Sequence, residues 1–336
     1  MATSIVPFNK LQVGIESVKG TLVAATRVIN GEHRFSEEQD FYRSANAIGV
    51  RANVGGAGVI TRKGCMLEVA SELTAEEILW PLLTGIRGAV TPTGAGADKT
   101  WTFTPQLTTA VLTIDSATLE FVRADGVTNH YYGEAGYGMT SSFKIDWAFN
   151  EVAKLAWSMF ARARQTGTPT AALSPYASRE ELVSPLLAVY QDTTWAGLGT
   201  TQLTGIIRSA SFECTTGLAP DYTLDARADK DMVQHKVSSL KATLSLVMEF
   251  DATAASRFAN YRANDIVFIR LKNTGSVVGA ANKTVQIDGA YRFTATPEFS
   301  ADGEQVLMTA SLESVYDSTS TKTLEFVVIN ALAAVA

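Results

Sequence analysis

The nucleophilic, titratable and metal-ligating residues of this chain are few and widely separated. Its 336 residues include three histidines, His33, His130 and His235, and two cysteines, Cys65 and Cys214. Their spacing builds no zinc site, no Cys-x-x-Cys redox pair and no His-Glu-x-x-His motif. We therefore expect two buried free thiols, no metal, no cofactor and no enzymatic activity.

Two glycine-rich stretches resemble phosphate-binding loops only superficially. In residues 94–100, Asp98 stands where a phosphate loop requires glycine before its lysine. Residues 133–138 are expected to form a turn between strands rather than a dinucleotide fingerprint. A strand, not a helix, is expected after each stretch, so no helix N-terminus would face a phosphate.

A set of carboxylates is the remaining chemical signal. By strand alternation, each lies on the polar side of an expected strand or at its end. The members are Glu68, Glu72, Glu120, Asp146, Glu249 and Asp251. An ordinary solvated sheet face would produce the same pattern, so a functional role requires an architecture that gathers these acids.

Composition excludes several classes of protein. Hydrophobic residues make up 46% and charged residues 18%, which excludes a disordered chain and hints at surface covered by neighbouring copies. The net charge of −6 disfavours a nucleic-acid-binding protein, which needs a basic footprint. Neither a signal peptide nor a long apolar stretch is evident, so we expect synthesis in a cytosol and no membrane association.

Hydrophobic patterning predicts a mainly β (α+β) protein with three segments. Residues 1–33 are expected to form an extended N-terminal arm. Residues 34–165 are expected to form a β-domain with a hairpin at about 43–64, tipped by residues 55–58, and a capped helix at about 74–86. Further strands are expected over 65–73, 101–104, 117–123, 131–134 and 139–149. Residues 151–162 fit a helix or a strand, and we favour a strand.

The second half, residues 166–336, follows a Thr/Pro/Ser-rich segment at about 165–176. Helices are expected at about 178–190 and 251–262, each opened by a capping residue. Strands are expected over 206–214, 222–226, 239–250, 266–272, 285–293, 306–316 and 324–328. The succession of strand, cap and helix occurs in both halves, which is typical either of a duplicated unit or of chance in an α+β chain.

The order of these elements resembles a known family. Residues 13–21 (VGIESVKGT) are similar to the G-x-E-S…G-T element that opens the tail tube (major tail) proteins of long, non-contractile-tailed bacteriophages, although Lys19 replaces the more usual aromatic residue. A capped helix, a Pro/Gly loop with a Trp strand, and the segments 117–121 and 137–145 follow in the family's order. The resemblance extends over most of the chain.

This resemblance implies a β-sandwich or split barrel with flanking short helices, an extended arm and a long hairpin. Such subunits form rings, usually sixfold, that stack into a hollow virion tail tube after assembly in the host cytoplasm. It implies a tape measure protein, terminator and tip proteins as partners, and double-stranded DNA in transit. The six acids named above would then line the lumen and repel phosphates. Contacts between subunits or rings would involve Phe8, Leu11, Val13, Val50, Val54, Val59 and Ile60.

Two questions stay open at this point. If both halves are tube units, three copies complete a sixfold ring, whereas a single decorated unit requires six, which we favour. The alternative functions are another β-rich virion component, such as a tail terminator, decoration or adhesion protein, and a ligand-binding module or enzyme.

Overall fold

The structure is a computed structural model that describes residues 8–43, 58–109, 111–125, 127–225 and 227–335. Strands account for 53% of the chain and helices for 7%, and the named strands pair antiparallel. The prediction of a mainly β protein is therefore confirmed.

The strands are β1 (Lys10–Ile15), β2 (Arg27–Ile29), β3 (Glu32–Tyr42), β4 (Val59–Glu72), β5 (Lys99–Phe103), β6 (Ala117–Ala124), β7 (Asn129–Ala148), β8 (Lys154–Ala161), β9 (Leu187–Asp192), β10 (Ile207–Thr215), β11 (Leu218–Asp221), β12 (Gln234–Val237), β13 (Lys241–Glu249), β14 (Val267–Val278), β15 (Ala281–Phe293), β16 (Glu298–Asp302), β17 (Gln305–Ser314) and β18 (Leu324–Asn330). The α-helices are α1 (Leu79–Gly85) and α2 (Ala252–Ala263), and the 3-10 helices are η2 (Ser184–Leu186) and η3 (Trp195–Gly197).

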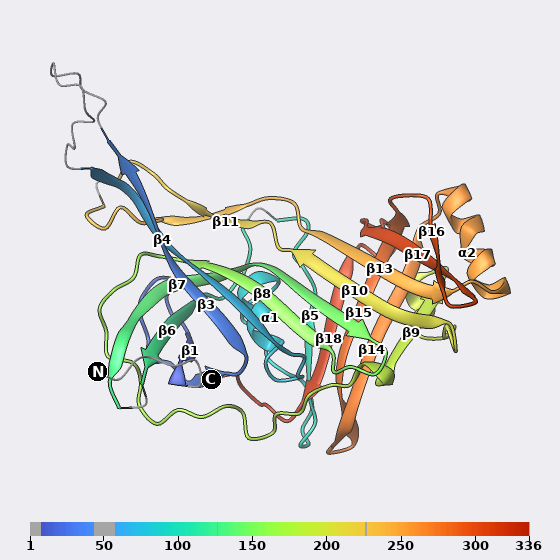
Figure 1. Cartoon of the computed structure of the whole chain (residues 1–336), viewed down its shortest axis with the longest axis horizontal. Coiled ribbons are helices and arrows are strands. Elements are labelled where there is room, and N and C mark those ends of the chain that lie inside the picture. The colour runs from blue at the N-terminus through green and yellow to red at the C-terminus, as the bar shows by residue number, and fades with distance from the viewer. Residues whose placement is uncertain (1–7, 44–57, 110, 126, 226, 336) are drawn as a thin grey trace.

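The central element of the fold is a run of antiparallel strands that we call the main sheet. Its order is β3-β4-β8-β7-β10-β13-β17-β16. The main sheet crosses the molecule from the blue β3–β4 hairpin to the red β16–β17 hairpin (Figure 1). In β13, Ala242, Leu244, Leu246 and Met248 are buried and the residues between them are not. This alternation is that of an antiparallel sheet with one face on the core and the other in water.

A second layer packs on the apolar side of the main sheet. It contains β2-β1-β6, which extend from the first half of β7, and β9-β14-β15-β18-β5. The Phe326 ring of β18 lies 5.7 Å from the Phe143 ring of β7 and 5.9 Å from the Phe212 ring of β10, between centroids. These aromatic contacts join the layers, and one buried cluster draws residues from both halves of the chain.

Strand β7 is long enough to belong to both layers. Up to Gly138 it pairs with β6, and beyond that residue it pairs with β8 and β10 on its two edges. The predicted turn over 133–138 is therefore wrong, because this stretch continues the strand. Its glycines permit close backbone approach: a Cβ atom on Gly138 would lie 2.7 Å from the carbonyl oxygen of Ala117.

Helix formation follows the capping signals at two of the three predicted places. The hydroxyl of Thr74 accepts a hydrogen bond from the Glu77 N–H at 3.0 Å, and α1 begins after this turn. The carboxylate of Asp251 accepts one from the Ala254 N–H at 2.8 Å, and Asn264 ends α2 in the left-handed conformation. Both helices agree with the prediction, although α1 starts later than expected.

The predicted helix over 178–190 is wrong, since the chain there forms η2 and β9 instead. Pro185 has no N–H to donate within a helix. Residues 178–181 fit a capping box in sequence, but its acids have other partners: Glu180 accepts from the Ser276 N–H at 2.9 Å, and Glu181 pairs with Arg179. The strand expected over 222–226 does not form in its described part.

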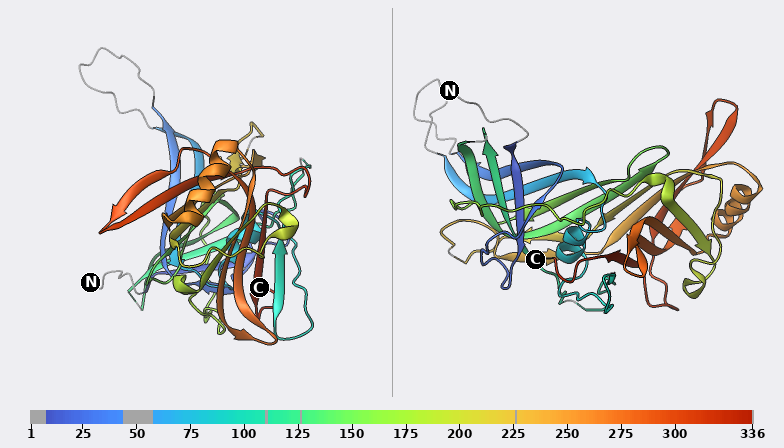
Figure 2. Two further views of the ribbon diagram at one scale, coloured as in Figure 1. Left: turned by 90° about the vertical axis from the view of Figure 1, so that its right-hand side faces the viewer. Right: turned by 90° about the horizontal axis from the view of Figure 1, so that it is seen from below.

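The N-terminal segment is folded into the second layer where the structure describes it. The apolar arm is expected to lie on its own domain or on a neighbour, and strand β1 pairs with β2 and β6 of its own chain. Strands β3 and β4 pair antiparallel, but most of the hairpin predicted at about 43–64, residues 44–57, lies outside the described residues. The β3–β4 hairpin and the β16–β17 hairpin project at opposite ends of the molecule (Figure 2). Residues 55–57 of the expected tip lie outside the described residues.

Candidate assembly surface

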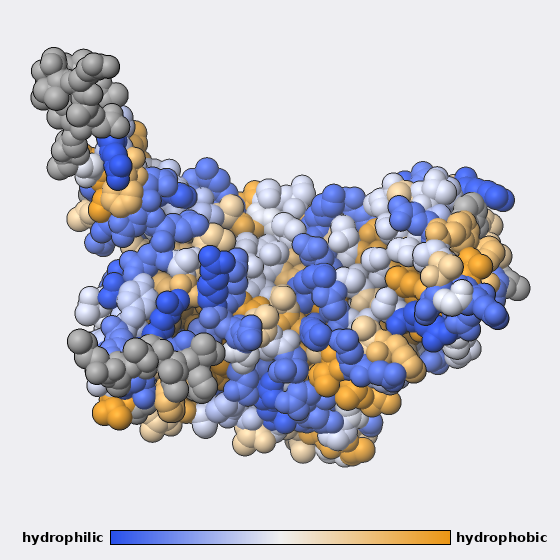
Figure 3. Space-filling model, viewed as in Figure 1, coloured by the Kyte–Doolittle hydropathy of each residue, from blue (hydrophilic) through white to orange (hydrophobic). Residues whose placement is uncertain are grey.

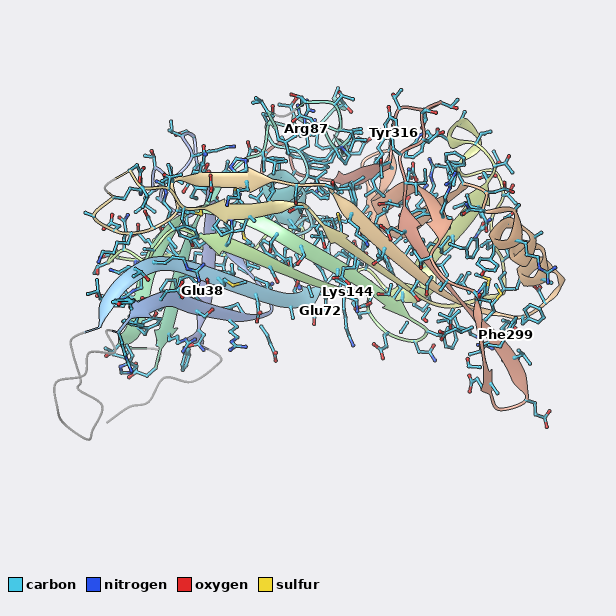
Figure 4. All side chains as sticks on the ribbon, turned by 90° about the horizontal axis from the view of Figure 1, so that it is seen from above. Glu38, Glu72, Arg87, Lys144, Phe299 and Tyr316 are labelled. Atoms are coloured by element: carbon cyan, nitrogen blue, oxygen red, sulfur yellow. The ribbon has the colours of Figure 1, made fainter. Side chains whose placement is uncertain are left out.

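The outward face of the main sheet, which we call the polar face, gathers side chains from many strands. Register places Glu68 of β4, Ser158 of β8, Ser142 of β7 and Thr215 of β10 in one cross-strand row. Seen from above, Glu72 and Lys144 lie on one side of the molecule and Arg87 on the other (Figure 4). Blue and pale side chains predominate over the middle of this face (Figure 3).

Several charged side chains on the polar face form ion pairs of opposite sign. Lys144 Nζ lies 2.9 Å from a carboxylate oxygen of Asp146, and Lys241 Nζ lies 3.1 Å from one of Glu313. Such exposed pairs add little stability. They do, however, place cations beside several of the carboxylates on this face, whereas Glu213 of β10 is a further exposed acid on it.

A row of hydroxyl groups runs between these pairs. Ser211 of β10, Ser245 of β13 and Ser311 of β17 stand opposite one another in register. The Ser211 hydroxyl donates to Asp146 at 2.6 Å.

Four of the six predicted acids lie on the polar face by strand register, each beside a cation. Glu68 is 3.9 Å from Arg34, Glu72 is 3.3 Å from Arg179, and Asp146 pairs with Lys144. Strand alternation is the signal that identified these positions. Whether they line a lumen stays a prediction.

The fourth polar-face acid is Glu249, at the end of β13, which pairs with Arg208. Of the remaining two, Asp251 caps α2. Glu120 is wrong as a solvent-facing acid, because it is only 2% exposed. Its carboxylate accepts hydrogen bonds from the Ala25 N–H at 2.9 Å and the Thr170 N–H at 2.6 Å. The segments that contain Ala25 and Thr170 therefore bury it.

A second buried carboxylate, Glu16, was not identified as a functional or structural site from the sequence. It accepts hydrogen bonds from the Gly20 N–H at 2.6 Å, the Tyr137 N–H at 2.8 Å and the Thr118 hydroxyl at 3.1 Å. Glu16 thus ties the loop after β1 to β6 and β7. The available signal was its place in the VGIES motif.

Exposed apolar side chains gather on both projecting hairpins. On the β3–β4 hairpin, Tyr42 stands opposite Val59, and they are 63% and 56% exposed. At the other end, the exposed rings of Phe250 and Phe299 meet edge to face at 5.0 Å, beside exposed Val306. Large apolar groups at projecting positions are typical of contact surfaces.

The predicted contact residues divide into three groups. Phe8 and Val59 are exposed and Ile60 is half-buried, so these three are available to a neighbour. Leu11 and Val13 are wrong as contact residues, because both are fully buried in the core of their own chain. Val50 and Val54 lie outside the described residues.

A buried ionic network joins the two glutamates that precede α1 to Arg179 and Lys283. Glu76 is 3.1 Å from Lys283 Nζ, and Glu77 is 3.4 Å from Arg179 Nε. Burial raises the pKa of both Glu76 and Glu77, and the neighbouring cations offset part of that rise. These groups therefore bind protons more tightly in the folded chain than in the unfolded chain.

The network predicts a pH dependence of stability. Just above pH 4.5 the folded state retains protons that the unfolded chain has released, so the contribution of these groups to stability falls as pH rises. We expect Glu76→Gln to flatten the decline in urea midpoint between pH 4.5 and 7. Glu68→Gln, at an exposed acid, is the control. An unchanged slope in Glu76→Gln would show that this carboxyl does not titrate in that range.

The histidines and cysteines form no shared site. His130 lies 3.1 Å from Asp125, and His235 lies 3.2 Å from the hydroxyl of Tyr137. Both cysteines are free and buried, as predicted, and burial raises the pKa of Cys65 to about 12. A thiol with so high a pKa is a poor nucleophile at neutral pH.

Within the described ranges, no group of three or more His, Cys, Asp or Glu side chains is placed to hold a metal ion. None of the helices in that part of the chain is long and apolar enough to cross a membrane. Comparison with known proteins gave no match to a family model and none to a curated protein.

Proposed function

We propose that this chain is a structural protein that assembles with copies of itself into stacked rings. The rings would form the hollow tail tube of a long, non-contractile-tailed bacteriophage, through which genomic DNA passes. The observation that carries the proposal is the main sheet. It has one apolar face and one polar face, and it ends in strands β3 and β16, each with a single strand neighbour among the described residues.

The strand edges at the two ends of the main sheet favour closure of this sheet by further copies. An unpaired strand edge presents free N–H and C=O groups, and pairing with another chain satisfies them. Closing a sheet into a barrel removes its edges, and the polar face would then line the lumen. Its paired charges and hydroxyl groups offer DNA few unpaired cations, so counterion release would contribute little to binding. A tape measure protein would occupy the lumen before DNA, and terminator and tip proteins would close the two ends.

Electron microscopy of the purified protein, concentrated and seeded with tail fragments, tests this function. We expect hollow tubes built of stacked rings, because head-to-tail stacking does not close on itself. Protein that stays monomeric even when seeded would contradict the proposal. It would favour another β-rich virion component, such as a terminator, decoration or adhesion protein.

A further inference from the structure

Two halves of the chain repeat the same strand order. The first half contains the paired series β3-β4-β8-β7-β6-β1. The second half contains β10-β13-β17-β15-β14-β9, again with every neighbour antiparallel. The order along the chain also matches, because β1, β3, β4, β6, β7 and β8 correspond in turn to β9, β10, β13, β14, β15 and β17.

The helices occupy matching places in this repeat. Helix α1 follows β4, and α2 follows β13, which is the counterpart of β4. Strand β16 also has a counterpart. It follows β15 and pairs with β17 on the edge that β15 also uses, as the second half of β7 follows the first half and pairs with β8. We name these series unit 1 and unit 2.

The joint between the two units lies inside the chain. Strand β10, the first strand of the main sheet in unit 2, pairs with the second half of β7 from Ser209↔Ala148 to Thr215↔Ser142. The joint therefore links one defined edge of unit 1 to the opposite edge of unit 2. The polar faces of the two units run on without a break across it.

The two ends of the main sheet are the counterparts of this joint. Strand β3 corresponds to β10, and β16 corresponds to the second half of β7, yet each has a strand neighbour on one side only among the described residues. All five residues of β16 are exposed. The two kinds of strand edge that pair at the β7–β10 joint therefore occur again at the two ends of the main sheet, where no described strand pairs with them.

The segments that connect β10 to β13 and β3 to β4 are also counterparts. Between β10 and β13 the chain forms the β11–β12 ribbon, which reaches back over unit 1. There Leu218 and Met232 pack with Met139 and Phe160, and Arg162 donates to the Val233 carbonyl at 3.1 Å. The counterpart in unit 1 is the outer end of the β3–β4 hairpin, where Tyr42 and Val59 remain exposed.

We infer that a second copy of this chain adds head to tail, with its β16 edge pairing antiparallel to the β3 edge of the first. The β3–β4 hairpin then lies on unit 2 of that neighbour, as the β11–β12 ribbon lies on unit 1 within the chain. This inference rests on the ring-forming function proposed above, and in such a ring each chain supplies two units. A ring of six units contains three chains, in place of the six favoured from the sequence.

Site-directed cross-linking tests the interface. Ser36 of β3 and Ser300 of β16 both lie on the polar-face side of their strands, by register with Met66 and Leu307. We expect a short bismaleimide to link Ser36→Cys protein to Ser300→Cys protein when the two are mixed and assembled. Each variant alone is the matched control and should give no dimer. Linkage within Ser36→Cys alone, or none in the mixture, would overturn the inference.

The mass of each ring separates this inference from the proposed function. Tubes with three chains of 36.0 kDa per ring would support both. Tubes with six chains per ring would overturn the two-unit ring and leave the tube function standing. Absence of tubes would contradict the tube function. Cross-linking of concentrated protein would still test the β3–β16 contact, and a mixture that gives no cross-link would overturn the inference.

Discussion

Replacing Glu16 by alanine is expected to lower the free energy of unfolding by about 3–5 kcal/mol. The side chain is 6% exposed, and its carboxylate accepts four hydrogen bonds. The donors are the N–H groups of Gly20 and Tyr137 and the hydroxyls of Ser116 and Thr118. Alanine leaves all four without this acceptor in a site with little access for water. Each unsatisfied buried group costs about 1–3 kcal/mol.

Urea unfolding followed by circular dichroism measures this effect. Glu68→Ala is the matched control, because Glu68 is an exposed carboxylate near one arginine, and its loss should change stability by less than about 0.5 kcal/mol. Glu16→Gln should fall between the two, since its amide keeps one acceptor oxygen but turns a donor toward the other N–H groups. Equal midpoints for Glu16→Ala and Glu68→Ala would show that the buried carboxylate does not hold β1 in place.

Local sequence patterns predicted most of the strands and two of the helices for clear physical reasons. Alternation in 239–250 and 151–162 reflects strands with one face on the core, and Asp251 supplies a cap whose bond is made within its own turn. The failures lie where distant residues decide the conformation. The Glu180 carboxylate accepts a hydrogen bond from the N–H of Ser276, almost a hundred residues away, so the capping box at Ser178 opens no helix.

The same distinction explains which site residues were predicted correctly. Alternation shows that a side chain points away from the core, but it does not show whether another segment covers it. Glu68 and Asp146 lie on an uncovered sheet, whereas Glu120 lies under the segment that contains Thr170. The duplicated unit was visible only as a faint echo, since strand order is encoded in pairings rather than in the spacing of residues.

In the proposed tube, replacing Ser245 by lysine is expected to convert the polar face from a surface that would release DNA into one that retains it. Ser245 lies in the hydroxyl row between Ser211 and Ser311, and the nearby lysines Lys144 and Lys241 are already paired with carboxylates. A lysine here would add an unpaired cation, repeated in every ring of the proposed tube. Each contact between such a cation and a phosphate releases counterions and steepens the salt dependence of log K by about 0.9.

Ejection from virions that carry the variant measures the consequence. We expect Ser245→Lys tubes to assemble, with DNA ejection slowed severalfold and restored by added salt, because salt weakens phosphate contacts steeply. Ser245→Gln, which is also longer than serine but uncharged, separates charge from bulk and should eject at the normal rate. If glutamine slows ejection as much as lysine does, steric narrowing rather than charge is the cause. Normal ejection from Ser245→Lys virions would mean that the polar face does not contact the DNA. A different surface of the subunit would then line the lumen.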